Sequence, residues 1–107
     1  MMVSFESFKA LDMRIAKITG CEEHPNADKL YVLTVDSGSD PKKIVAGIRL
    51  HYKKEELLGK EVVVVNNLER LSIRGVESHG MLLVAHDGER IVFLKPEREV
   101  AAGSKIS

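Results

Sequence analysis

The segment Gly75–Gly80, GVESHG, holds the residue types of a nucleophilic catalyst, because a serine stands beside a histidine. Its spacing is G-x-x-S-x-G, whereas the nucleophile elbow of hydrolases is G-x-S-x-G between a strand and a helix. Ser78 and His79 are also adjacent in sequence, and adjacent side chains point to opposite sides of an extended backbone. The segment therefore does not predict a catalytic serine.

Metal and phosphate-loop chemistry have equally weak support. Cys21 and His24 are spaced like a pair of metal ligands, but the sequence holds no second pair to complete a tetrahedral site. The other histidines fall on separate expected elements. The glycines of 75–80 precede no expected helix, which a phosphate loop requires. The sequence thus predicts a domain without catalytic residues, metal or cofactor.

Residue types suited to binding a ligand are more numerous than catalytic ones, and they gather in the segments 23–29 and 69–79. The first is rich in turn formers, and the second follows the apolar run Val62–Val65. Amide, guanidinium, ammonium and hydroxyl groups can donate to phosphates and 2′-hydroxyls. For any single lysine, an ordinary solvated position is the simpler interpretation. The candidate binding residues, with the nearby Lys60, are His24, Asn26, Asp28, Lys29, Asn66, Asn67, Arg70, Arg74, Ser78 and His79.

Short strands and two helices are expected to position these groups. Ser4 is suited to cap a helix over 3–11, with Phe5, Phe8 and Leu11 on one face. Residues 52–58 are helix formers followed by Gly59, and 69–80 is expected to be irregular. The expected strands cover residues 12–23, 30–35, 43–48, 62–65, 81–86 and 90–94, with hairpin turns at 38–41 and 87–88.

This order predicts an all-β fold, a five-stranded Greek-key barrel of the OB type with a short helix between its third and fourth strands. A five-stranded sandwich or another small barrel would give a similar pattern. We expect one domain over 1–107, with a helix at 3–11, the barrel at 12–86 and a hairpin and tail at 87–107. In OB barrels the loops joining strands one to two and four to five meet the ligand. On this strand count they are the two polar segments.

The run Val62–Val65 also bears on assembly. A strand that is apolar on both faces is expected to be buried on both faces. One face would line the barrel, and the N-terminal helix, the C-terminal tail or a second subunit would cover the other. The pattern leaves a homodimer and a purely intramolecular cover equally open.

Composition limits the class of partner. The 107 residues carry 16 basic and 16 acidic side chains, so any nucleic-acid contact must come from a local patch. A single cysteine, no targeting segment and no apolar run of membrane length predict a soluble cytoplasmic protein with no membrane partner. Tyr31 and Tyr52 are the only aromatic candidates near the two segments, so base stacking is poorly supplied and recognition of folded RNA by shape is favoured.

Several stretches together resemble the tRNA-binding domain family. That family includes the C-terminal or β-subunit domain of methionyl-tRNA synthetase, free-standing tRNA-binding proteins and the cytokine-like synthetase cofactors. Secretion-associated chaperones are similar. The match runs through the whole chain in order, and its combined motifs are highly specific. They are LDMRI at 11–15, HPNADKLY at 24–31, IVAGI at 44–48, Asn67-Leu68, RGVES at 74–78 and Gly80-Met81-Leu82.

The resemblance implies an OB fold, tRNA binding without base-specific readout, and dimerisation through segments outside the barrel. It adds Met81 to the candidate tRNA-binding residues. Glu69-Arg70 stands where the family commonly has Lys-Pro, and His79 where it often has Gln or Glu. The leading hypothesis is a non-catalytic tRNA-binding and dimerisation module of methionyl-tRNA synthetase, with tRNA, a second copy and the catalytic domain as partners. The alternative is a dimeric, chaperone-like peptide binder.

Overall fold

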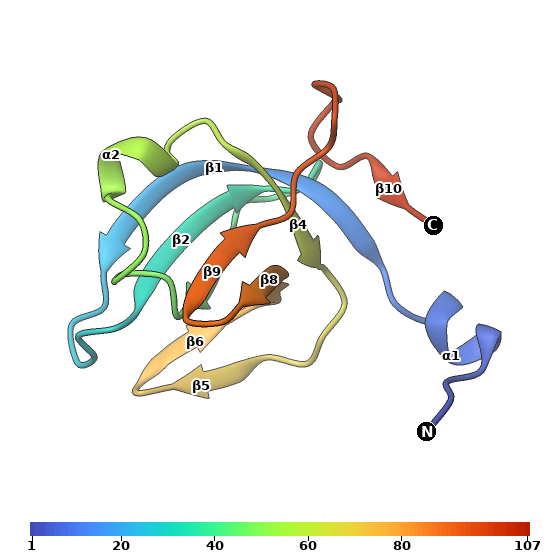
Figure 1. Ribbon diagram of the computed structural model, residues 1–107, viewed down its shortest axis with the longest axis horizontal. Coiled ribbons are helices and arrows are strands. Elements are labelled where there is room, and N and C mark those ends of the chain that lie inside the picture. The colour runs from blue at the N-terminus through green and yellow to red at the C-terminus, as the bar shows by residue number, and fades with distance from the viewer.

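The computed structural model describes residues 1–107, which form two short helices and ten strands (Figure 1). Helix α1 spans Phe5–Lys9 and α2 spans Lys54–Leu57. As predicted, Ser4 caps α1 by accepting a hydrogen bond from the amide of Ser7. The strands are β1 Met13–Glu23, β2 Tyr31–Asp36, β3 Lys42–Ala46, β4 Glu61–Val65, β5 Leu71–Ile73, β6 Val76–Ser78, β7 Met81–Leu82, β8 Val84–Asp87, β9 Arg90–Phe93 and β10 Lys105–Ile106.

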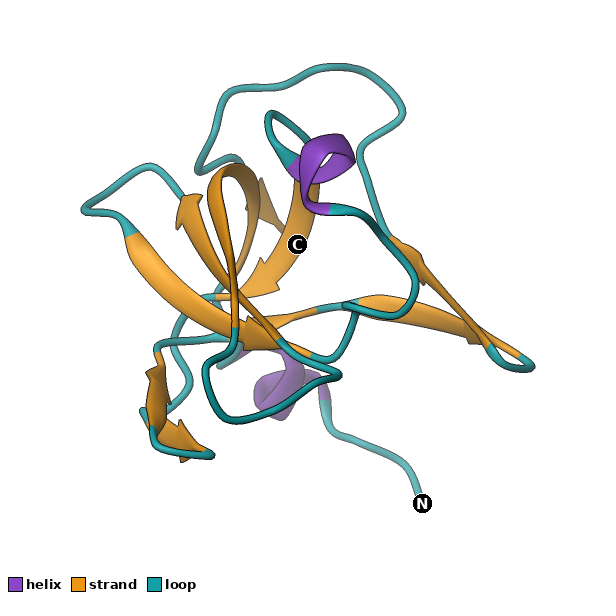
Figure 2. Cartoon of the chain, turned by 90° about the vertical axis from the view of Figure 1, so that its left-hand side faces the viewer, coloured by secondary structure: helices purple, strands orange, loops and turns teal.

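The main sheet is antiparallel and is built around the long strand β1. Its order is β3-β2-β1-β4-β7, and β10 pairs with the start of β1. The first half of β1 pairs with β4 and the second half pairs with β2. The register with β2 shifts between Ile18 and Gly20, and such a bulge increases twist and bends the strand. β1 can therefore belong to both sides of a curved sheet, and Figure 1 shows its arc. Figure 2 shows the curved strands from the side.

The two edges of this sheet meet, so that it forms a nearly closed barrel. The amide of His79 donates to the carbonyl of Lys43 over 2.8 Å. The amide of Val45 donates to the Ser78 hydroxyl over 3.0 Å. Together with α2 between β3 and β4, this arrangement confirms the predicted OB-like barrel with a small helix.

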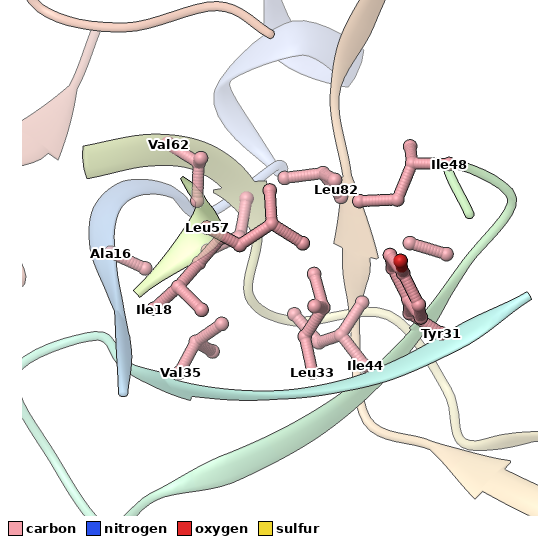
Figure 3. Close-up of a cluster of buried hydrophobic side chains, with 12 residues drawn as sticks. Ala16, Ile18, Tyr31, Leu33, Val35, Ile44, Ile48, Leu57, Val62 and Leu82 are labelled. Atoms are coloured by element: carbon pink, nitrogen blue, oxygen red, sulfur yellow. The ribbon is translucent and has the colours of Figure 1, made fainter. Parts of the chain in front are cut away.

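One apolar core fills the barrel. Its members include Ile18, Leu33 and Val62 from three strands, each at most 1% exposed. Leu57 of α2 is fully buried among them, which explains why so short a helix is held at the end of the barrel. Figure 3 shows these side chains converging in the interior. The β8–β9 hairpin packs Phe93 against the same core.

Two expectations for the second half of the chain are wrong. Segment 69–80 is not irregular, because it contains the β5–β6 hairpin. Its turn is made by Arg74 and Gly75, which both have positive φ, 53° and 89°, as the tight turns of two-residue hairpins require. The single strand expected at 81–86 is two strands: β7 pairs with β4, and β8 pairs with β9.

The valines of β4 are buried within one chain. Each of Val62–Val65 is at most 8% exposed, so their burial requires no second subunit. Helix α1 behaves differently, because its Phe5 is 72% exposed and the helix stands off the barrel (Figure 1). Neither helix is long or apolar enough to cross a membrane.

The C-terminal segment is fastened to β1 and to the β2–β3 turn. The amide of Gly103 donates to the carbonyl of Ile15 over 2.7 Å. A Cβ on Gly103 would lie 2.7 Å from the Cα of Gly38 and 2.8 Å from the carbonyl oxygen of Ser37. Gly103 also has a φ of 91°. This close backbone approach is therefore available only to glycine.

We expect Gly103→Ala to destabilise the fold more than Gly59→Ala. Both glycines have left-handed φ, 91° and 86°, which costs an alanine ~1–2 kcal/mol. Only at Gly103 would the new methyl group meet backbone, adding a further ~1–3 kcal/mol. The free energies of unfolding in urea measure the difference, and equal losses in the two variants would contradict the packing argument.

Candidate nucleic-acid interface

The two segments singled out in the sequence lie side by side at one end of the barrel. The loop between β1 and β2, residues 24–30, runs beside the turn of the β5–β6 hairpin, residues 71–78 (Figure 1). We call these the first loop and the hairpin. Three hydrogen bonds from the side chains of His24, Asn26 and Arg74 join the first loop to the hairpin. A fourth, from the Asn26 amide to the His24 ring, lies within the first loop.

His24 is the buried centre of this contact, at 3% exposure. Its Nδ1 accepts a hydrogen bond from the amide of Asn26 over 3.0 Å. Its Nε2 lies 2.9 Å from the carbonyl oxygen of Ile73, which can only accept, so Nε2 carries the proton. Both ring nitrogens are therefore occupied inside the protein, and His24 presents no polar atom to a ligand.

Asn26 and Arg74 bond to each other's backbone. The Asn26 amide nitrogen donates to the Arg74 carbonyl over 3.2 Å, and the Arg74 guanidinium donates to the Asn26 carbonyl over 3.3 Å. Both residues are exposed, unlike His24. The guanidinium keeps further donors free for a ligand, since it has five N–H groups.

Positive charge is exposed where the first loop meets the hairpin. Lys29 and Arg74 line a surface hollow of about 420 Å³, together with Asp28. The sequence did not single out Arg49, which also holds this loop. Its guanidinium donates to the carbonyl of Ala27 over 3.3 Å and pairs with Glu23. No motif marked Arg49, because it simply follows the third strand.

Arg70 and His79 flank one carboxylate on the hairpin. Glu77 Oε1 lies 3.4 Å from the Arg70 guanidinium and 2.7 Å from Nε2 of His79. Arg70 is largely exposed, with a side-chain exposure of 70%, so this pairing is screened by solvent and weak. The structure places both residues at the base of the hairpin, just before β5 and just after β6, away from the turn that faces the first loop.

Ser78 closes the barrel. It is buried, accepts from the Val45 amide, and donates to the carbonyl of Gly80 over 3.0 Å. Its hydroxyl therefore has partners on both sides and is not presented to solvent.

Asn66 and Asn67 connect β4 to the start of β1. Asn67 donates to the carbonyl of Ala10 over 2.7 Å and accepts from the amide of Asp12 over 2.8 Å. The Asn66 side chain accepts from Lys42 Nζ over 2.8 Å. The hydrogen bond from the Arg14 guanidinium lowers the pKa of the neighbouring Asp12 carboxyl. These polar groups hold the end of β4 against the residues before β1 and against β3, and none of them bonds to the first loop.

Lys60 and Met81 also lie elsewhere. Lys60 Nζ sits 5.7 Å from the ring centre of Tyr52, beside β9. Met81 is 47% exposed and lines an apolar hollow of about 280 Å³ with β3 and β8 residues. The structure thus brings together His24, Asn26, Asp28, Lys29 and Arg74. Lys60, Asn66, Asn67 and Met81 neither bond to these residues nor line their hollow.

Neither tyrosine offers a free face for stacking a base. Tyr31 is 5% exposed and donates its hydroxyl proton to the carbonyl of Tyr52 over 2.8 Å. Burial raises the pKa of the Tyr31 hydroxyl. Tyr52 stacks on Phe93 with ring centres 4.3 Å apart. Both rings are used for packing.

Cys21 and His24 do not form a metal centre. Burial raises the pKa of the Cys21 thiol, which disfavours the thiolate that a metal needs, and His24 has no free ring nitrogen. No group of three histidine, cysteine or carboxylate side chains is arranged to hold a metal ion.

Sequence comparison relates the chain to methionine–tRNA ligases. The chain is 54% identical over 104 residues to the methionine–tRNA ligase of Pyrococcus furiosus. The aligned segment covers 97% of this chain and 14% of that protein. The chain thus spans about 14% of the length of the curated relatives it matches.

Solved structures show the same fold over the whole chain. A MetRS-related protein from Pyrococcus horikoshii superposes with a TM-score of 0.91 at 30% identity, covering 100% of this chain and 99% of that one. The chaperone CsaA from Bacillus anthracis gives 0.89 at 33% identity, covering 100% of both chains. The sequence model of the tRNA binding domain family matches residues 13–105. The chain therefore belongs to the tRNA binding domain family.

Proposed function

We propose that residues 1–107 act as a non-catalytic tRNA-binding module of a cytoplasmic methionyl-tRNA synthetase, whose catalytic domain is fused to it or separate. The observation that carries this proposal is the position of Lys29 and Arg74. They flank one exposed hollow at the loop end of an OB-like barrel, in a chain of this family. Loops at this end are where OB barrels meet nucleic acid.

The proposed mode of binding is contact with the RNA backbone. Guanidinium and ammonium groups bind phosphates without reading sequence, and neither tyrosine is free to stack a base. A chain with 16 basic and 16 acidic residues has little long-range attraction for RNA, so binding depends on few local contacts. We expect affinity in the micromolar range.

Such weak binding is useful when it is tethered. A short link to a catalytic domain raises the effective concentration of bound tRNA to about the millimolar range. The module would thereby hold folded tRNA near the ligase site while contributing no chemistry itself.

A second candidate function, binding of extended peptide, has a specific observation in its favour. The fold matches that of chaperone CsaA, and Met81, Leu82 and Ile91 line an apolar hollow. This hollow adjoins the one beside Lys29 and Arg74, because a Cβ on Gly47, which lines the first, would lie 3.7 Å from Leu30, which lines the second. Peptide in this hollow would depend on apolar contacts and would not respond to salt.

The proposal further includes a homodimer formed through α1 and β10. Phe5, Phe8 and Leu11 line an apolar hollow of about 380 Å³ with Ile106. Phe5, Phe8 and Leu11 are all exposed in the single chain, and contiguous exposed apolar groups favour a protein interface. A second copy is the occupant that the family resemblance implies.

We expect Lys29→Ala and Arg74→Ala each to weaken tRNA binding by about fivefold, ~1 kcal/mol. Each should also reduce the dependence of log affinity on log salt by about one unit, because a phosphate contact is lost. Filter binding or fluorescence anisotropy with several tRNA species measures both. Lys95→Ala, an exposed lysine after β9, is the control and should bind as the parent does. Salt-independent binding, or an effect on one tRNA species only, would contradict backbone recognition.

We expect an unfolded polypeptide to leave bound tRNA in place. The competition uses labelled tRNA at half saturation, with a reduced and alkylated protein added as peptide competitor. Displacement of tRNA by the polypeptide, together with no loss of polypeptide binding in Arg74→Ala, would favour the chaperone-like function instead.

We expect the parent protein to sediment as a dimer and Phe5→Glu/Phe8→Glu as a monomer, because charge would be placed in the apolar contact of α1. Val92→Glu is the control, since Val92 is 40% exposed on β9, away from α1. Sedimentation equilibrium measures the masses. A parent protein that is monomeric at the concentrations of the binding assay would contradict the proposed dimer.

A further inference from the structure

The backbone of the hairpin turn adopts a conformation that needs support. Arg74 is the only non-glycine residue with positive φ, at 53°. Such a conformation persists only where the surroundings hold it in place. The end of the hairpin is bonded to β3 through Ser78 and His79, but its turn has no bond to the main sheet. β5 and β6 pair only with each other, and such a two-stranded hairpin alone is at best marginally stable in water.

Two side chains of the first loop supply the support. His24 donates to the carbonyl of Ile73, the residue immediately before the strained position. Asn26 donates to the carbonyl of Arg74 itself. Two consecutive carbonyls of the turn are therefore held from the neighbouring loop, one by a buried ring and one by an exposed amide.

The same contacts orient the Arg74 side chain. Its guanidinium donates to the carbonyl of Asn26. His24 in turn holds the Asn26 amide, so the loop backbone that receives the guanidinium is itself fixed. His24, Asn26 and Arg74 thus form a closed set of contacts, which we call the loop latch.

We propose that His24 and Asn26 are positioning residues that set Arg74 for contact with the tRNA backbone, and that neither supplies the contact itself. This inference rests on the proposed function, since it assigns to Arg74 the RNA contact and to its neighbours the geometry of that contact. It replaces the sequence-based expectation that His24 and Asn26 bind RNA directly. His24 is 3% exposed with both ring nitrogens occupied, and the one hydrogen bond of the Asn26 side chain goes to the Arg74 carbonyl.

The physical advantage of the latch is that Arg74 is ordered before RNA arrives. Immobilising a long side chain on binding costs conformational entropy, and pre-organising it removes part of that cost. A chain with few basic contacts gains most from such pre-organisation, since each contact carries a large share of the affinity.

A double-mutant cycle of tRNA binding tests the proposal. We expect Asn26→Ala to weaken binding nearly as much as Arg74→Ala, about fivefold, and the double variant to bind no more weakly than Arg74→Ala alone. Lys29 makes no hydrogen bond or ion pair with the latch residues, so Asn26→Ala and Lys29→Ala should combine additively. Additive losses for Asn26→Ala and Arg74→Ala would overturn the proposal, because they would mean that Asn26 contacts RNA independently.

A second test compares two variants of His24, one of which can keep the hydrogen bond to the carbonyl of Ile73. We expect His24→Ala to lose affinity and His24→Gln to retain most of it, because the glutamine amide can still donate to the carbonyl of Ile73. Equal losses in both variants, at unchanged melting temperature, would count against the latch. Asn26 is exposed, so the Asn26 cycle stands even if His24→Ala does not fold.

Hydrogen exchange in the free protein separates this inference from the proposed function. We expect the amides of 71–78 to exchange faster in Asn26→Ala than in the parent, with the core of β1 unchanged. If the parent protein binds no tRNA, the proposed function fails and the positioning role with it. If the parent binds tRNA but exchange is unaltered in Asn26→Ala, the latch alone is wrong.

Discussion

The meeting of the two sheet edges is the constraint on which the rest of the structure depends. The Val45 amide and the Lys43 carbonyl bond to Ser78 and His79, which brings the end of the hairpin against β3. Without this closure, the buried strands of a small sheet would expose one side of their core to water. Because the hairpin ends at Ser78, closure also decides where its turn lies, beside the first loop.

Residues 71–78 therefore both close the barrel, through Ser78, and carry the proposed RNA contact, Arg74. Arg74 and Glu77 are exposed and charged, while Ser78 is buried and is satisfied by backbone groups. This division explains how a domain with no net charge can present a basic contact. The cations need no excess over the acids; they need only a fixed position at one end of the barrel.

Much of this could be predicted from the sequence, and the failures have identifiable causes. Alternating apolar residues located β1 and β2, the turn at 38–41 located β3, and the continuous run Val62–Val65 located β4. The dipeptide Asp87-Gly88 located the β8–β9 hairpin. The β5–β6 hairpin was missed because its turn uses Arg74, a residue that rarely adopts positive φ. The break after Leu82 was missed because a change of strand partner leaves no local signal.

The sequence by itself determined the fold class and family, and which residue types gather in the two loop segments, because periodicity and local motifs are properties of neighbouring residues. Only the tertiary structure decided what each polar residue does. Ser78 and Asn67 resembled binding groups in sequence, but they bond to backbone brought from distant parts of the chain, β3 and the end of α1. His24 likewise meets Ile73, 49 residues away. A donor is free for a ligand only when no internal acceptor reaches it, and that depends on the folded neighbours of each side chain.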